Sequence, residues 1–171
     1  MDPHNRFESR GTFLLARLEN LAALLACVTL ALLHLDEIHW PHFIALFAWI
    51  DLVGYIPGAI AYRRKPGGAV GRVYFTLYNL MHSFLFNGAV AIVWSLTIGA
   101  GWALLAIPIH LLGDRALFGN SFKPWGTSFE PQVHPAFARF EREFGEARPR
   151  SAGEAIHAAF PPGGGARGAE G

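Results

Sequence analysis

Hydrophobic positions along the chain gather in four long stretches instead of alternating with polar positions. The stretches cover residues 13–35, 41–62, 73–96 and 99–118. Each is close to the ~20 apolar residues that cross the hydrocarbon core of a bilayer as a helix. The pattern therefore predicts an all-α protein, an integral membrane four-helix bundle whose transmembrane domain occupies residues 13–118.

Basic residues alternate between the links that join these stretches. Lys and Arg precede the first stretch, return in residues 63–72 and follow the fourth stretch, whereas residues 36–40 and 97–98 contain neither. Links enriched in Lys and Arg are the cytoplasmic ones in membrane proteins. We therefore expect a multi-pass protein with both termini in the cytosol.

The chain changes character on either side of the apolar stretches. Residues 1–12 form a short cytosolic N-terminal segment, and residues 119–144 are predicted as a cytosolic loop that ends in a short amphipathic helix. In that helix Phe137, Phe140 and Phe144 share one face. Residues 145–171 are rich in Gly, Pro, Ala and Arg, which predicts a disordered tail.

Composition supports the membrane assignment and argues against a nucleic-acid partner. Hydrophobic residues make up 52% of the chain and charged residues 16%, whereas a soluble domain has about 25% charged residues. The net charge of +1 provides no field that would attract nucleic acid. The lipid bilayer is the expected partner, and a homo-oligomer is left open. The single cysteine, Cys27, excludes an intrachain disulfide.

Ionisable residues inside the apolar stretches are the candidates for chemistry. A charge at the bilayer centre costs about 2.5–3.5 kcal/mol on insertion scales, so such residues mark internal sites. At ~1.5 Å per residue, Asp51 and His82 lie near mid-membrane, and His110 lies closer to the cytosol. His110 and Asp114 are four positions apart and share a helix face. The candidates for this cytosol-facing polar site are Glu19, Asp51, Tyr55, Tyr78, Asn79, His82, His110, Asp114 and Arg115.

Two functions remain open for this polar site. Groups of Asp, Glu and His suit proton relay, and they also suit binding of a metal ion or a small amphipathic ligand. Alternatively, His82, His110 and Asp114, helped by Asp51 or Glu19, would bind a divalent metal that activates water against a lipid ester, in a membrane-embedded hydrolase. No enzyme motif decides between them, so the catalytic residues and the cofactor stay open. A divalent metal is one candidate, and haem or quinone is a weaker one.

Glycine and proline inside the stretches predict two local features. Gly54 and Gly58 are four apart, which permits close packing of a neighbouring helix. Pro108 removes a backbone hydrogen bond two residues before His110, which predicts a kink beside the polar site.

A second group of metal-binding residue types lies in the first link, residues 34–42. His, Asp and Glu are zinc ligands, but their spacing here matches no defined zinc motif. An ordinary link kept free of Lys and Arg is the favoured interpretation, with metal binding as the alternative. The residues are His34, Asp36, Glu37, His39 and His42.

Four short motifs occur in a recognisable order. They are Leu-Ala-Arg-Leu-Glu at 15–19, Asp-Leu-Val-Gly-Tyr at 51–55, Tyr-Asn-Leu-Met-His-Ser at 78–83 and His-Leu-Leu-Gly-Asp-Arg at 110–115. Gly119 and Lys123 follow. In these motifs the chain resembles small bacterial membrane proteins grouped as domain of unknown function family 4260. The resemblance covers roughly residues 13–125. It implies a four-helix protein of the bacterial inner membrane, and it implies no activity.

Overall fold

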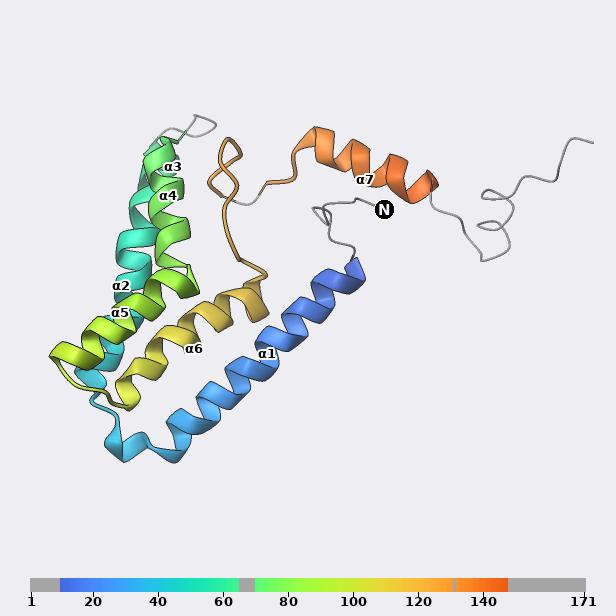
Figure 1. The fold of residues 1–171 in the computed structure, drawn as a ribbon. Coiled ribbons are helices and arrows are strands. Elements are labelled where there is room, and N and C mark those ends of the chain that lie inside the picture. The colour runs from blue at the N-terminus through green and yellow to red at the C-terminus, as the bar shows by residue number, and fades with distance from the viewer. Residues whose placement is uncertain (1–9, 65–69, 131, 148–171) are drawn as a thin grey trace, which may run out of the picture. The chain divides into compact units, whose positions relative to one another are not determined.

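The computed structural model describes residues 10–64, 70–130 and 132–147, and within these ranges it contains helices and loops but no strand. The all-α prediction is therefore confirmed for the described part of the chain. The chain divides into two units, Met1–Glu130 with the apolar helices and Pro131–Gly171 with one amphipathic helix, and each is described by itself. Figure 1 shows the helices in chain order.

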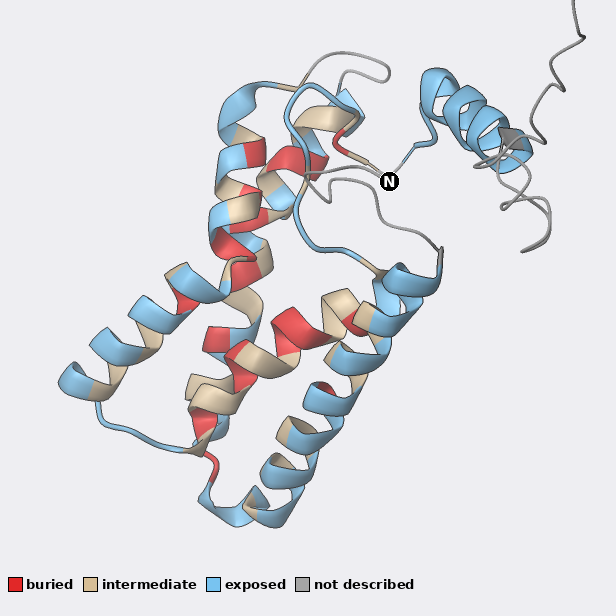
Figure 2. Cartoon of the chain, turned by 45° about the vertical axis from the view of Figure 1, so that its right-hand side comes forward, coloured by how far each residue is buried: buried red, intermediate tan, exposed pale blue. Residues whose placement is uncertain are grey.

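The first apolar stretch forms α1 (Arg10–Leu33), an unbroken helix that is long and apolar enough to span a bilayer. It packs against the fourth stretch through a small cluster around Leu24. Most of its other leucines, such as Leu18 and Leu32, are exposed (Figure 2). A helix that presents apolar residues on nearly every side suits an environment of lipid.

The second apolar stretch forms α2 (Trp40–Gly54) and α3 (Ile56–Arg64), which together are also long and apolar enough to span a bilayer. Pro41 lies in the first turn of α2, where the lack of an N–H has no cost. A turn at Tyr55 separates the two helices. Pro57 accounts for the turn, because a proline cannot donate the hydrogen bond that continues the helical ladder.

The third apolar stretch differs from the single helix that hydropathy predicts. It is divided at His82 and Ser83 into α4 (Arg72–Met81) and α5 (Phe84–Thr97), and the two helices are bent by 58°. The Ser83 hydroxyl accepts hydrogen bonds from two N–H groups of the first turn of α5, so it starts the new helix as an N-cap. The bent pair is long and apolar enough to count as a third span if it is taken as one.

The fourth apolar stretch forms consecutive 3₁₀-, α- and π-helical segments. A 3₁₀ turn, η2 (Trp102–Leu105), leads into α6 (Ala106–Gly113), which widens into a π-helical turn, η3 (Asp114–Phe118). Pro108 is the third residue of α6, within its first turn, and the π-helical turn η3 follows His110. The kink expected beside His110 stays a prediction. By length and composition, the described residues therefore contain two helices able to span a membrane, or three with the bent pair.

Buried side chains gather where α6 meets its neighbours and where α3 meets α4 (Figure 2). At Gly54 a Cβ atom would lie 2.7 Å from the Met81 Cβ, so glycine allows α2 to approach α4 closely. At Gly58 a Cβ atom would lie 2.1 Å from Phe129 of the loop after η3. The predicted close packing at both glycines is therefore present, but the partner of Gly58 is a loop residue.

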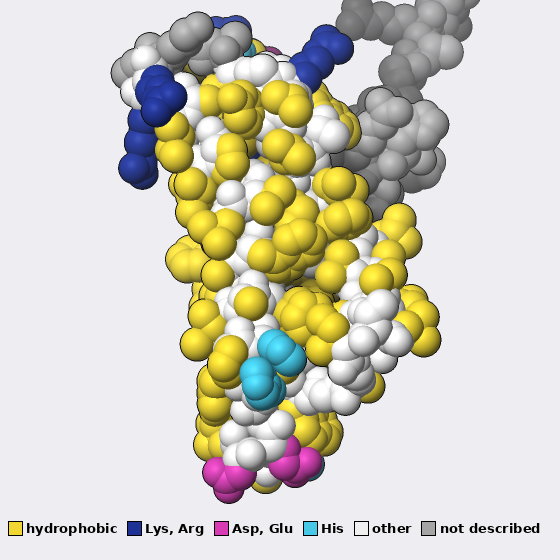
Figure 3. Space-filling view, turned by 90° about the vertical axis from the view of Figure 1, so that its left-hand side faces the viewer, with side chains coloured by type: hydrophobic (Ala, Val, Ile, Leu, Met, Phe, Trp, Pro, Cys, Tyr) yellow, Lys and Arg dark blue, Asp and Glu magenta, His cyan; other side chains and the backbone are white. Residues whose placement is uncertain are grey.

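The unit Met1–Glu130 has charged groups at its two ends. The short 3₁₀ turn η1 (Leu35–Glu37) carries Asp36 and Glu37, whereas α3 ends on Arg63 and Arg64. Figure 3 shows hydrophobic side chains covering the face between the acidic and the basic groups. This is the distribution that a bilayer imposes, because charged groups stay out of the hydrocarbon core.

The second unit contains α7 (Pro135–Ala147), which is three residues longer than the predicted helix. The rings of Phe137 and Phe140 lie 6.3 Å apart and those of Phe140 and Phe144 lie 5.6 Å apart, so the three share a face as predicted. The predicted disordered tail falls mostly on residues 148–171, which lie outside the described residues, as do residues 1–9 of the N-terminal segment.

Candidate functional site

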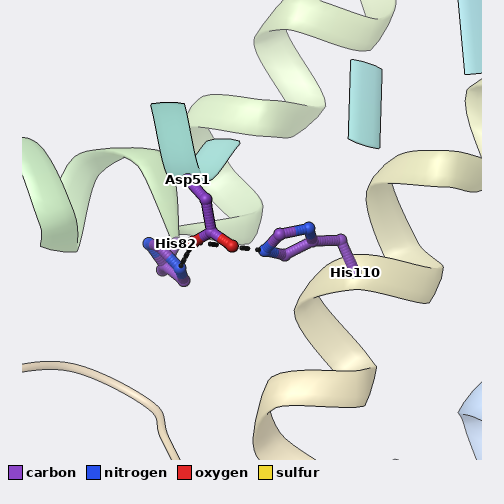
Figure 4. Close-up of side chains that lie close together, drawn as sticks. All are labelled: Asp51, His82 and His110. Atoms are coloured by element: carbon purple, nitrogen blue, oxygen red, sulfur yellow. Dashed lines mark ion pairs between the residues drawn. The ribbon is translucent and has the colours of Figure 1, made fainter. Parts of the chain in front are cut away.

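Two imidazoles and two carboxylates from three separate parts of the chain meet inside the helical unit. Figure 4 shows Asp51 of α2 between His82, at the break after α4, and His110 of α6. The Nε2 atom of His82 lies 3.4 Å from Asp51 Oδ1 and 3.2 Å from Asp114 Oδ2. The Nε2 atom of His110 lies 3.7 and 3.8 Å from the same two oxygens. We call these four residues the His/Asp cluster.

The His/Asp cluster is closed on its histidine side and open on its aspartate side. The side chains of His82 and His110 are 3% and 4% exposed. Asp114 is 21% exposed and Asp51 is 43% exposed. A small ion or molecule therefore has access to the cluster along the Asp51 carboxylate.

The break between α4 and α5 positions His82. His82 is the residue that caps α4, and its ring stacks on the Tyr78 ring at 3.9 Å with an angle of 14° between the planes. Its Nδ1 atom lies 2.9 Å from the Tyr78 carbonyl oxygen, so this nitrogen carries a proton and donates it. The bond leaves Nε2 as the atom that faces both carboxylates, which fixes the orientation of the imidazole.

Side chains bond the backbone carbonyl groups at the break between α4 and α5. The Asn87 amide donates to the Met81 carbonyl at 2.5 Å and to the Ser83 carbonyl at 3.2 Å. The Arg115 guanidinium donates to the His82 carbonyl at 3.3 Å. Non-helical backbone at membrane depth is tolerated only where such partners exist, so these two residues support the break. Hydropathy gives no sign of this role for Asn87, although an amide in an otherwise apolar helix is a usable signal.

His110 is the least satisfied member of the His/Asp cluster. Both of its ring nitrogens are buried and have no hydrogen-bond partner. The Phe47 ring covers it from the side, with 4.7 Å between the ring centres. A buried imidazole that has no hydrogen bond but points a nitrogen at two carboxylates is suited to bind a cation between them.

The spacing of the His/Asp cluster fits a metal ion. Ligand atoms of Asp51, His82 and His110 all lie within 4.8 Å of one another. Charge-assisted N–H···O bonds measure about 2.7–2.9 Å, and all four N···O separations here, 3.2 to 3.8 Å, are longer. Bonds of about 2.0–2.2 Å to a tetrahedral ion place its ligand atoms roughly 3.4 Å apart. Asp114 is not part of that set of three, although its Oδ2 atom lies 3.2 and 3.8 Å from the two Nε2 atoms. The spacing therefore suits an ion best among Asp51, His82 and His110.

Of the other predicted site residues, two contact the cluster, two contact the loop after η3 and one does neither. Tyr78 stacks on His82, and Arg115 bonds its carbonyl group. Tyr55 and Asn79 contact the loop after η3, where they bond Glu130 and Lys123. Glu19 is exposed on α1 and takes part in none of the ion pairs among the described residues, so it does not join the site.

The loop between η3 and Glu130 covers the basic end of α3 and α4, a role that hydropathy does not reveal. The Asn79 amide and the Lys123 backbone exchange two hydrogen bonds of 2.8 and 2.7 Å. The Lys123 ammonium lies 4.7 Å from the centre of the Tyr78 ring and bonds the Phe129 carbonyl group. Burial lowers the pKa of Lys123. Through Tyr78 the loop contacts the ring that supports His82.

The first link does not form the alternative metal site. Its five candidate residues are all described, and no three of them bring ligand atoms within 4.8 Å of one another. Instead, His34 stacks on Trp102 at 3.7 Å and bonds Glu37 at 2.8 Å. The link is thus organised by aromatic contacts and by one carboxylate.

Comparison of the chain with known protein families, with curated proteins and with solved structures finds no match. The resemblance to family 4260 stays a prediction. Function must therefore be inferred from the geometry and the chemistry of the His/Asp cluster.

Proposed function

We propose that the protein is a multi-pass membrane protein that binds a divalent transition-metal ion within the His/Asp cluster. One observation carries this proposal: the Nε2 atoms of two histidines each lie 3.4 to 3.7 Å from a carboxylate oxygen of Asp51 and 3.2 to 3.8 Å from one of Asp114. A set of two imidazoles and two carboxylates suits zinc, iron or manganese.

Charge and hydrogen bonding both favour an ion at this position. The two carboxylates of the cluster are anionic ligands, and their combined charge would match that of a divalent ion. His82 donates its Nδ1 proton to the Tyr78 carbonyl group, and this outer hydrogen bond is the arrangement that metal-binding histidines adopt. The unpartnered Nε2 of His110 gains a bond in the same step.

The proposed setting of the ion is a four-span bundle in a bacterial inner membrane, with both termini in the cytosol. The acidic turn η1 and the basic end of α3 support this orientation. Arg17 of α1 donates to the Ala116 and Leu117 carbonyls at 2.9 and 2.8 Å, which links the N-terminal half of α1 to the end of η3. A fourth crossing, through α6 and η3, follows if that end is cytosolic, and the resemblance to family 4260 implies the same arrangement.

Metal analysis of the purified protein tests the proposal. The full chain is purified in detergent, and zinc, iron and manganese are measured by inductively coupled plasma mass spectrometry. We expect about one ion per chain, and a loss of about tenfold or more in affinity for His110→Ala, since even outer-shell changes cost about 10–100-fold. His134→Ala, which removes an exposed imidazole from the second unit, is the matched control and should keep the ion.

The same measurement separates metal binding from proton relay. If the wild-type protein holds no ion after incubation with each metal, the metal proposal fails and proton relay is favoured. A double-mutant cycle with His82→Ala and His110→Ala supplies a second criterion. Additivity of the two stability changes within about 0.5 kcal/mol would mean that the histidines do not act on a common ion.

A metal-dependent hydrolase is the second candidate function, and the exposure of Asp51 favours it. Catalytic metal sites keep a position open for water, whereas structural sites are closed by protein ligands. Asp51 is 43% exposed, so the cluster has an open side. A metal-bound water of lowered pKa would then attack an ester of a hydrophobic substrate. Hydrolysis of a fluorogenic lipid ester that requires added metal and is absent in His110→Ala would support this function, and equal rates in both proteins would exclude it.

A further inference from the structure

At the acidic end of the helical unit, the first link and the link between α5 and η2 enclose a pocket of about 200 Å³. This volume is below the ~300–1,000 Å³ of sites for drug-sized ligands, so the pocket suits a small group. Its walls come from η1, the start of α2, the end of α5 and η2. We call it the link pocket, and its principal side chains are Glu37, His39, His42, Trp94 and Trp102.

Aromatic rings form most of the side-chain wall of the link pocket. His39 and His42 lie 3.9 Å apart between ring centres, and His42 meets the Trp94 ring edge-on at 5.2 Å. Across the pocket, Trp102 is held by its stacking contact with His34. Figure 3 shows histidine side chains exposed on the surface near the acidic groups. Rings already packed against one another need little rearrangement to receive a ligand.

One carboxylate supplies the charge of the link pocket. Glu37 accepts hydrogen bonds from His34 Nδ1 at 2.8 Å and from Trp102 Nε1 at 3.1 Å. These two bonds lower the pKa of Glu37, so it stays ionised. Lys and Arg are absent from the residues that line the pocket. The C-terminal end of α5, which carries the negative end of the helix dipole, also lies at the pocket.

We propose that the link pocket binds a small organic ammonium group between Trp94, Trp102 and the Glu37 carboxylate. Indole faces attract cations through the ring quadrupole, and a carboxylate among aromatic rings adds the charge that selects a cation over a neutral group of the same shape. A metal ion is a poorer fit, because the imidazoles and the acids of the first link do not bring three ligand atoms together. The ammonium group belongs either to a free amine or to the head group of a zwitterionic lipid.

Binding of choline to the full chain in detergent tests this proposal by isothermal titration calorimetry. The neutral comparison is dimethylbutanol, in which carbon replaces the ammonium nitrogen. We expect choline to bind and dimethylbutanol to bind at least about tenfold more weakly, a difference of about 1.4 kcal/mol. Equal binding of the two compounds, or no binding of choline, would overturn the proposal.

Matched variants locate the site. Glu37→Gln keeps the shape and an acceptor oxygen for Trp102, and it should weaken choline binding about tenfold. Asp36→Asn, in the same turn, should leave choline binding within about twofold, because Asp36 is not among the residues that line the pocket. If Glu37→Gln lowers the melting temperature, choline binding is measured for Trp94→Leu instead, and it should be weaker than for the wild type. Trp40→Leu, which changes an exposed tryptophan outside the pocket, is the control. If neither variant differs from its control in choline affinity, choline binds outside the link pocket.

Lipid composition distinguishes the two sources of the ammonium group. The same titration is made in nanodiscs of phosphatidylcholine and of phosphatidylglycerol. If the pocket takes a lipid head group, phosphatidylcholine competes and weakens choline binding, whereas phosphatidylglycerol does not. If the natural ligand is a free amine, choline binds equally in both kinds of disc. The His110→Ala variant should bind choline normally, since the metal proposal concerns a different set of residues.

Discussion

Single polar side chains allow an irregular backbone to exist among apolar helices. Asn87 is fully buried and bonds two carbonyl groups at the break between α4 and α5, and Arg115 bonds a third. Gly58 acts in a different way: it has no side chain, and this leaves room for the Phe129 ring. Both kinds of residue support the structure around His82 without belonging to the His/Asp cluster.

The buried amide of Asn87 should be important for stability. Asn87→Leu leaves the Met81 carbonyl without its amide donor in an apolar environment, which costs about 1–3 kcal/mol, whereas the Ser83 carbonyl keeps the N–H of residue 87. We expect a lower melting temperature in detergent, followed by circular dichroism. Ser95→Ala is the control, because the Ser95 hydroxyl bonds only the Ala91 carbonyl of its own helix. Equal losses for the two variants would show that Asn87 does not support the break.

The two glycines Gly58 and Gly88 should respond differently to the same substitution. Gly58→Ala places a Cβ atom 2.1 Å from a Phe129 ring carbon, so the ring must leave its site. Overpacking of this kind costs about 1–3 kcal/mol. Gly88→Ala in α5 meets nothing within 4 Å and should be neutral or slightly stabilising. The midpoints of thermal unfolding measure both, and a tolerated Gly58→Ala would mean that Phe129 is not firmly docked.

At the scale of elements, hydropathy predicts the apolar stretches but not their breaks. The four predicted ranges agree with the helices to within about three residues at each end, which is the ordinary uncertainty of helix boundaries. The break at His82 and Ser83 carries no Gly or Pro, the usual signals of interruption, so it was missed. Its cause lies in side-chain hydrogen bonds: the Ser83 hydroxyl caps α5, and the side chains of Asn87 and Arg115 bond the carbonyl groups of the break.

The loop after η3 was missed as a structural element for a different reason. Its contacts join residues about forty positions apart in the sequence, such as Asn79 and Lys123, and no local pattern predicts such pairs. The members of the His/Asp cluster are easier to predict from the sequence. Residues four positions apart share a helix face, and the depth of each residue follows from its position along its own helix. Glu19 has a suitable predicted depth, but its side chain is exposed on α1 and does not join the cluster. Depth alone does not specify which face of a helix a residue occupies.

Removing the Asn79 amide should release this loop. Asn79→Leu deletes both hydrogen bonds to the Lys123 backbone, so segments around Phe122 and Trp125 should become sensitive to chymotrypsin. Trypsin is unsuitable, because Pro124 follows Lys123. Thr76→Val, one turn earlier on α4, removes a hydroxyl that bonds only within its helix and should leave the cleavage rate unchanged. The same cleavage rate in both variants would indicate that the loop is held by Phe129 alone.

At the scale of the whole molecule, charge and polarity are separated along the direction of the helices. Glu37 and the link pocket lie at the acidic end, Arg63 and Arg64 at the basic end, and the His/Asp cluster on the helices between them. A bilayer would place the two proposed sites in different environments, one at a membrane surface and the other within the apolar layer. Their ligands would therefore reach the protein by separate routes.

The number of crossings decides which membrane surface the end of η3 faces. We expect the chain to cross four times, so that Asp36 and Ala100 lie outside and Ser121 lies in the cytosol. Single cysteines, Asp36→Cys, Ala100→Cys and Ser121→Cys, are introduced into a Cys27→Ser background and treated with a membrane-impermeant maleimide in intact cells. The first two should be labelled, and the third only after the membrane is permeabilised. Labelling of Ser121→Cys in intact cells would show that the segment 102–118 does not cross, which would place the end of η3 on the same side as the link pocket.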